Sequence, residues 1–377
     1  MTDFLSYCMV KKRNYELDFW KFVSAIFVIL FHSHTIFDGE KTVLLNGYLT
    51  VGLFYIITGF LFASSVYRDT RPFDVNTIGK ETWQFICKKT KGFLYYYIFG
   101  FAGTFIADCF ATNGDKINLQ RFPGYFADFL LLRETGMPFE GVMGANWYLS
   151  SMLIALFILY PVFRYKKQIF SHIASPIIAV VLFGYMFMRT ESLAIPPAES
   201  AGLFTSHTLQ AISQICMGVT AFAISEELRN RKCSKLEKTL LSLVDIFCIV
   251  SAFILIIYGK KVSMQPCIVF LFFVFVCVSG SQQAYVTDIF KKRPCAFLGK
   301  LSLSVYLSHS IVRSSVKALK LKFPELGNVF SNDTQRQIII SLAIYLAACF
   351  AVAVICIVIC EAVTKLIDNI KQNKKGL

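Results

Sequence analysis

Ten apolar stretches, each about 20 residues long, follow one another along this chain of 377 residues. A stretch of that length is what an α-helix needs to cross the hydrocarbon core of a bilayer. Helices are favoured there because they satisfy every backbone polar group internally. The pattern therefore predicts an all-α integral membrane protein with about ten transmembrane helices, near residues 17–37, 47–67, 92–111, 145–163, 173–190, 206–225, 240–258, 262–281, 296–316 and 337–361.

The composition supports a chain that lies mostly in lipid. Charged residues make up 16% of it and apolar residues 55%, whereas soluble domains carry roughly 25% charged residues. We expect one transmembrane domain over 1–377, in which 1–13 form a short cytoplasmic segment and 363–377 a basic cytoplasmic tail. The first apolar run is too long for a signal peptide and lacks a small-residue cleavage site, so we expect it to be retained.

The distribution of basic residues predicts the orientation. The set of connections that includes both termini carries 25 Lys and Arg, and the alternate set carries 11. Because cytoplasmic loops are enriched in Lys and Arg, we expect both termini in the cytoplasm of a multi-pass protein. Two connections, 259–261 and 317–336, are locally basic on the other side.

The net charge of +14 does not indicate nucleic acid. The basic residues form short clusters between apolar stretches, as loops near anionic lipid do, and no basic stripe with interleaved aromatics is present. Membrane lipid is therefore an expected partner and nucleic acid is not. The twelve cysteines are scattered without a Cys-x-x-Cys pair or a histidine at ligand spacing, so no metal site is expected.

Polar residues interrupt the first apolar run. Asp18, Lys21, Ala25, Val28 and His32 are spaced by three or four residues, which places them on one face of a helix. An ionisable side chain inside a span is costly if it faces lipid, so this stripe should face a protein interior or a wet cavity. His32 lies about 20 Å beyond Asp18 along the axis, in the outer half of the membrane.

The residue types on this stripe suggest chemistry. A neutral imidazole such as that of His32 can take a proton from an attacking hydroxyl, the task of a general base. Asp18 and Lys21 can neutralise each other as an i, i+3 pair at the cytoplasmic boundary. A structural role for His32, with a hydrogen bond to a neighbouring helix, remains the alternative.

Five segments, in order, resemble the acyltransferase 3 family of bacterial membrane proteins. Its first motif is matched by Arg13, Leu17, Asp18, Lys21, Ala25 and His32, with Lys21 where the family usually has Arg. Its later motifs are matched by GLFYIITGFLF (52–62), NWYLSSMLIALFILYPVF (146–163), FLGKLSLSVYLSHSIV (297–312) and Glu361. No single motif is specific, but five in register with ten predicted spans are.

The resemblance implies an acyltransferase of the bacterial cytoplasmic (inner) membrane. Such a protein transfers an acyl group, usually acetyl from acetyl-CoA, to a hydroxyl of a cell-surface glycan or its lipid-linked precursor. Acyl-CoA would then be the co-substrate. We expect His32 to be the general base, with Asp18 and Lys21 as the further catalytic-site residues at the cytoplasmic end.

The expected donor site departs from the family pattern. Where the family has arginines followed by Pro-x-Tyr, this chain has Lys88, Lys89 and Lys91, then Gly92 and a run of tyrosines. Lysine supplies positive charge for phosphate but not the bidentate fork of arginine. We expect these lysines and Arg13 to bind acyl-CoA. The alternatives are a different donor, no donor, or a simple cytoplasmic anchor.

The expected acceptor site lies at the start of the fourth span and on the ninth. Asn146 and Trp147 open the former, and Tyr306 and His309 are three residues apart on the latter, so they face the same way. We assign these four residues to the acceptor. Trp147 is equally typical of an interfacial aromatic belt, and Tyr306 and His309 of hydrogen bonds between helices.

Two other function classes remain. A transporter or flippase for a small solute or glycan precursor could use the same polar interior with donor binding lost or altered. Broken helices at matched positions in the two halves would favour it, and the sequence shows none. A non-catalytic membrane subunit would leave the polar stripe unexplained. The sequence leaves open the acceptor, the acyl group and whether the chain forms a homo-oligomer.

Overall fold

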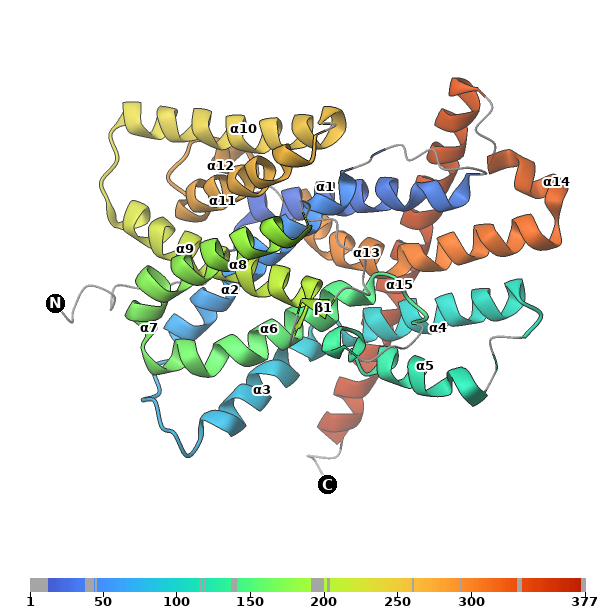
Figure 1. Ribbon diagram of the computed structural model, residues 1–377, viewed down its shortest axis with the longest axis horizontal. Helices are drawn as coiled ribbons and strands as arrows, with labels where there is room; N and C mark the ends of the chain where they lie inside the picture. The colour runs from blue at the N-terminus through green and yellow to red at the C-terminus, as the bar shows by residue number, and fades with distance from the viewer. Residues whose placement is uncertain are drawn as a thin grey trace.

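The computed structural model describes residues 13–37, 44, 46–114, 117, 119–136, 141–190, 200–201, 204–259, 261–291, 293–330 and 334–373. Helices dominate it (Figure 1). They are α1 (Tyr15–His32), α2 (Thr50–Arg68), α3 (Ile78–Lys91), α4 (Leu94–Ala111), α5 (Phe122–Phe129), α6 (Asn146–Tyr165), α7 (Lys167–Ile169), α8 (Ser175–Thr190), α9 (Ser206–Asn230), α10 (Lys235–Tyr258), α11 (Gln265–Ser281), α12 (Val286–Ile289), α13 (Arg293–Lys322), α14 (Pro324–Gly327) and α15 (Gln335–Asn373).

Shorter elements join these helices. A π-helical turn, Phe170–Ala174, connects α7 to α8. The 3-10 turns are Ser33–Ile36, Gly47–Leu49, Leu119–Arg121, Arg133–Thr135, Val262–Met264 and Asn328–Phe330. Strands β1 (Ser200–Ala201) and β2 (Phe204–Thr205) form a small antiparallel pair, in which Ser200 is opposite Thr205.

The predicted fold class and number of spans are confirmed. Within the described residues, ten helices are long and apolar enough to cross a membrane. The largest difference is at the last helix, which continues to Asn373 instead of ending near residue 361. Most of the expected tail 363–377 is therefore helical, whereas 1–12 and 374–377 lie outside the described residues.

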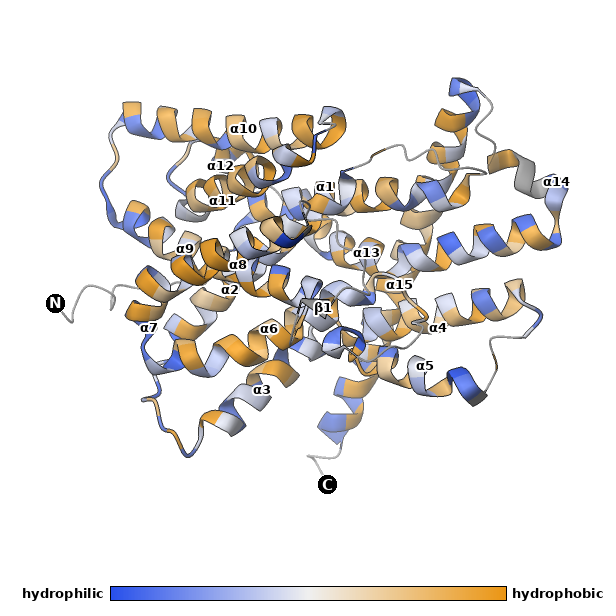
Figure 2. Ribbon diagram, viewed as in Figure 1, coloured by the Kyte–Doolittle hydropathy of each residue, from blue (hydrophilic) through white to orange (hydrophobic). Residues whose placement is uncertain are grey.

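The helices divide into central and peripheral ones. The apolar windows of α2 and α9 are 78% and 83% buried, whereas those of α8, α10 and α15 are about one third buried or less. In Figure 2, α8 and α10 are mostly hydrophobic and hydrophilic residues gather at the connections. Exposed apolar side chains such as Val180, Phe247 and Val358 are what lipid-facing helices require.

Helices α2 and α9 cross at a pair of glycines. A Cβ at Gly59 would lie 2.0 Å from the carbonyl oxygen of Ile215, and a Cβ at Gly218 would lie 2.0 Å from that of Ile56. Only glycine therefore allows this approach, as at other close helix crossings in membranes. The crossing brings the ends of α2 and α9 together at the end of the bundle where α1 begins.

The polar stripe of α1 faces the protein, as predicted. Asp18, Ala25 and Val28 are buried, and Lys21 and His32 are partly buried. Helix α1 packs on α13, which also packs on α4 and α15. Helices α1, α4 and α15 thus all pack against α13.

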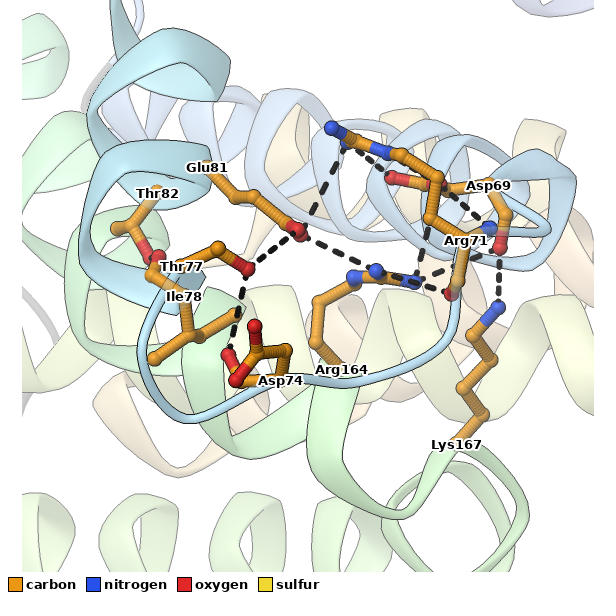
Figure 3. A network of polar contacts seen from close by, with 9 residues as sticks. All are labelled: Asp69, Arg71, Asp74, Thr77, Ile78, Glu81, Thr82, Arg164 and Lys167. Atoms are coloured by element: carbon orange, nitrogen blue, oxygen red, sulfur yellow. Dashed lines mark hydrogen bonds and ion pairs between the residues drawn. The ribbon is translucent and has the colours of Figure 1, made fainter.

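A charge network holds the amphipathic helix α3 against the end of α6 (Figure 3). The side chain of Arg164, on α6, is 1% exposed and its Nη2 lies 3.1 Å from Oε2 of Glu81, on α3. The same guanidinium donates to the carbonyl oxygens of Asp69 and Arg71, and Lys167 also donates to the Asp69 carbonyl. Hydrogen bonds from Arg71 lower the pKa of the Asp69 carboxyl to about 2, so this carboxyl stays ionised at neutral pH.

Aromatic contacts complete the docking of α3. The ring of Phe85 stacks on Tyr160 of α6 at a centroid distance of 4.6 Å. On the other side of α3, Trp83 is 63% exposed, as expected for a basic amphipathic helix lying at a membrane surface. The predicted donor lysines therefore occupy a helix of fixed position before the third span.

Replacing the buried guanidinium should release α3. In Arg164→Met, Glu81 stays buried and loses its closer ion pair, while the longer one to Nη2 of Arg71, at 3.8 Å, is kept. We expect a loss of about 3 kcal/mol or more of unfolding free energy. The measurement is the thermal unfolding midpoint of the purified protein in detergent. The double variant Arg164→Met/Glu81→Gln removes both charges and should recover part of the loss. A single variant as stable as the native protein would contradict this role.

Candidate active site

Polar groups concentrate at two ends of the packed pair α1 and α13. We call the end where α1 begins the N-terminal end, and the end where it finishes the opposite end. Asp18 marks the first and His32 the second, and fourteen residues of helix separate them by about 20 Å. The two ends differ in charge and in chemistry.

At the N-terminal end, Asp18 lies between two cations. Its Oδ2 accepts a hydrogen bond from Nε of Arg13 at 2.5 Å, and its Oδ1 lies 2.6 Å from Nζ of Lys21. Arg13 also donates to the carbonyl oxygen of Ala296, on α13, at 3.0 Å. A Cβ at Gly299 would lie only 2.8 Å from Cγ of Asp18, so glycine at this position lets the ion pairs sit directly against α13.

A cavity of about 390 Å³ opens beside this cluster, and we call it the N-terminal cavity. Its charged lining consists of Arg13, Asp18, Lys21, Arg68, Glu226 and Arg229. Apolar side chains, among them Phe60 of α2 and Phe222 of α9, form part of the remaining wall. Among the described lining residues, four cations against two carboxylates leave an excess of positive charge, which suits a phosphate-bearing ligand.

The predicted donor residues differ in whether they line the N-terminal cavity. Arg13 lines the N-terminal cavity, whereas Lys88, Lys89 and Lys91 do not. Lys89 lies close enough to Arg68, a residue of the cavity lining, to interact with its positive charge. The Nζ atom of Lys89 lies 5.5 Å from the ring centre of Phe85. Burial lowers the pKa of Lys89 to about 8, with smaller contributions from the neighbouring charges of Arg68 and Lys88.

Arg68 and Arg229 also line the N-terminal cavity, although they were not among the residues predicted from the sequence. Each lies in the last turn of a spanning helix, where basic residues are expected as cytoplasmic anchors. Their position at the same predicted membrane face as Arg13 was the available signal. The crossing of α2 and α9, which brings them to one cavity, has no signature in the local sequence.

At the opposite end, two of the predicted residues meet. The ring of His32 stacks on that of His309 with a centroid distance of 5.3 Å and an interplanar angle of 22°. Nδ1 of His309 lies 2.7 Å from the carbonyl oxygen of Tyr306. Because a carbonyl only accepts, Nδ1 carries the proton and Nε2 of a neutral His309 is an acceptor. This Nε2 is buried without a hydrogen-bond partner among the described residues.

The other predicted acceptor residues form a neighbouring cluster. Nδ2 of the buried Asn146 donates to the hydroxyl of Tyr97 at 3.1 Å, and the ring of Trp147 stacks on His207 at 4.3 Å. Trp147 is thus partly buried, with its ring against α9. Tyr306 connects this cluster to the histidine pair, since its hydroxyl donates to the carbonyl oxygen of Ala145 at 3.4 Å.

A second cavity, of about 640 Å³, opens at this end, and we call it the opposite cavity. Thr35 and Arg313 are part of its lining. Thr35 is three residues beyond His32 and Arg313 is four beyond His309, so each lies one helical turn from the histidine pair. Arg313 interacts electrostatically with both rings. The opposite cavity therefore begins about one helical turn beyond the histidine pair, and neither His32 nor His309 is among its described lining residues.

Comparison with known proteins identifies the family. The acyltransferase 3 family model, described as an acyltransferase domain, matches residues 14–361. No curated protein and no solved structure matches the chain. The matched region begins just before α1 and includes nearly the whole lining of both cavities. The chain is therefore a multi-pass membrane protein that belongs to the acyltransferase 3 family.

Proposed function

We propose that this protein moves an acyl group, acetyl in the simplest case, from cytosolic acyl-CoA to a hydroxyl of a cell-surface glycan or its lipid-linked precursor. Membership of the family supports acyl transfer as the reaction class. The observation that carries the proposal is the pair α1 and α13, which has a cationic cavity at one end and a stacked, partly exposed histidine at the other.

The N-terminal cavity is the proposed donor site. The excess of Lys and Arg on the side of the termini supports a cytoplasmic position, where acyl-CoA is present. Arg13, Lys21, Arg68 and Arg229 would bind its phosphates, and Lys89 would add positive charge beside Arg68. An extended pantetheine arm is comparable in length to the stretch of α1 from Asp18 to His32, so the thioester could reach the histidine pair.

The proposed reaction uses His32 as the general base. Its imidazole takes the proton of the acceptor hydroxyl while the hydroxyl oxygen attacks the thioester carbonyl carbon. A carbon–oxygen bond forms, the carbon–sulfur bond breaks, and the CoA thiolate leaves with the proton returned by His32. Stacking on His309, which is fixed by the Tyr306 carbonyl, orients the His32 ring. Asp18 and Lys21 act as positioning residues at the other end of α1.

Removing the base should abolish transfer without removing donor binding. We expect His32→Ala to lower the rate at least 100-fold, the usual scale of general-base catalysis. The measurement is CoA release by protein reconstituted with acetyl-CoA and a glycan extract. The matched control is His172→Ala, because His172 lies outside both cavities. Unchanged transfer by a well-expressed His32→Ala would contradict the proposal, and solute uptake without any acyl donor would favour a transporter.

Neutralising the arginines of the N-terminal cavity should weaken donor binding. We expect Arg68→Gln and Arg229→Gln each to raise the acetyl-CoA dissociation constant about tenfold, because a charge-assisted hydrogen bond contributes about 1.5 kcal/mol or more. Titration calorimetry with purified protein measures this. Lys232→Gln is the control, since Lys232 is exposed and does not line the cavity. Native affinity in both arginine variants would contradict this donor site.

Donor affinity should also depend on Lys89 ionisation. Its pKa of about 8 means that it is mostly charged at pH 7 and mostly neutral at pH 9. Acetyl-CoA binding should therefore weaken about fivefold over this interval, equivalent to about 1 kcal/mol. In Lys89→Arg the charge persists and this dependence should disappear. The same pH profile in both proteins would rule out a contribution from Lys89.

A further inference from the structure

The opposite cavity is strongly basic. Its charged lining residues are Asp108, Arg133, Arg313, Lys317 and Lys320. Connections outside the cytoplasm are normally poor in Lys and Arg, so the positive-inside rule gives no reason for four cations at the end away from the termini. Among the described lining residues, four cations against one carboxylate leave a net excess of three positive charges, which instead points to an anionic ligand.

Two of these cations are built into the cavity wall. A Cβ at Gly144 would lie 3.2 Å from Nη2 of Arg313, and a Cβ at Gly141 would lie 2.7 Å from Nη1 of Arg133. Arg133 also donates to the carbonyl oxygen of Met143 at 3.3 Å. Both guanidinium groups therefore lie against the backbone of 141–144, where side chains would displace them.

Hydrogen bonds to a buried carboxylate fix the backbone of 141–144. Asp128, on α5, is 2% exposed, and its Oδ2 accepts hydrogen bonds from the backbone N–H groups of Val142 at 2.7 Å and Met143 at 3.1 Å. The hydroxyl of Tyr97 donates to the Asp128 carbonyl at 2.6 Å, and Asn146 donates to that hydroxyl. The segment that supports the two arginines is thus tied to α4, α5 and α6.

Three of the cations that line this cavity are available to a ligand. Arg133, Arg313 and Lys317 form no ion pair with any residue in the part of the chain that the structure describes. Guanidinium groups match the oxygens of phosphate in a bidentate manner. A phosphate monoester carries nearly two negative charges at neutral pH. It therefore neutralises an excess of three positive charges better than a single carboxylate does.

We propose that the opposite cavity binds the phosphate of a phosphate-bearing sugar and that this sugar is the acyl acceptor. Its volume of about 640 Å³ has room for a sugar beside the phosphate. Arg313 lies one turn from His309, so a phosphate bound there places the hydroxyls of the attached sugar near His32. The acceptor role rests on the proposed function, whereas phosphate binding does not.

The test is binding of glucose 1-phosphate, compared with glucose, to the full chain in phosphatidylcholine nanodiscs saturated with CoA. Saturating CoA fills the proposed donor site in the N-terminal cavity, and the control variant below, measured without CoA, shows independently of that site which cavity holds the sugar phosphate. We expect glucose to bind at least tenfold more weakly than its phosphate. Arg313→Gln and Lys317→Gln should each reduce phosphate binding at least tenfold, with folding verified by thermal stabilisation with CoA.

The matched control is Arg68→Gln/Arg229→Gln, measured without CoA, which should leave sugar-phosphate binding unchanged. Equal binding of glucose and glucose 1-phosphate would overturn the inference. Loss of binding only in the control variant would also overturn it, because the phosphate would then occupy the N-terminal cavity. The exposed Lys317 keeps the test valid if Arg313→Gln fails to fold.

Two further arms identify the source of the phosphate. Phosphatidylglycerol in the nanodiscs should change glucose 1-phosphate affinity less than threefold, and abolition of binding would show a lipid-headgroup site and overturn the sugar assignment. A polyprenyl-diphosphate sugar that binds tenfold tighter identifies a lipid-linked acceptor, and equal binding identifies a phosphate-containing glycan. Either result supports the inference. Phosphate binding without acyl transfer contradicts only the proposed function, and transfer without phosphate binding contradicts only this inference.

Discussion

The contact between α1 and α13 is the interaction on which the rest of the site depends. At one end, Arg13 and Asp18 form an ion pair directly against Gly299, and at the other end His32 stacks on His309. Both helices are continuous between these points, so the ion pair at one end fixes the register of the rings at the other. A charged residue inside a span is tolerated when it is paired and faces protein, and the buried Asp18 meets both conditions.

The two cavities use positive charge differently. In the N-terminal cavity, Asp18 and Glu226 offset part of the charge, and the arginines come from the ends of spanning helices, where a membrane protein normally carries them. In the opposite cavity, Arg133 and Arg313 lie against the backbone of 141–144, and Asp108 is the one acidic residue among the described lining residues. A basic cavity at each end and an apolar span between them form an arrangement that suits the proposed transfer of a group across the bilayer on a flexible arm.

Sequence alone predicted the features that the bilayer and the helical period impose. The bilayer thickness sets the length of each span, so the ten spanning helices could be found from the lengths of the apolar stretches. The helical period of 3.6 residues places Asp18 and His32 on one face of α1, and this face was predicted to point into the protein. Contacts between distant segments could not be read in this way. Arg68 and Arg229 reach one cavity only because α2 and α9 cross at their glycines, and the position of Lys89 depends on the docking of α3 at the end of α6.

The most direct test of the account is the sidedness of transfer in sealed proteoliposomes of uniform orientation. Acetyl-CoA labelled in the acetyl group is supplied on the face carrying the termini, and the acceptor is enclosed on the other face. The account predicts that label accumulates in the enclosed acceptor, and that supplying the donor from the acceptor side gives none. Transfer only when donor and acceptor share one face would contradict a path along α1 and α13 across the membrane.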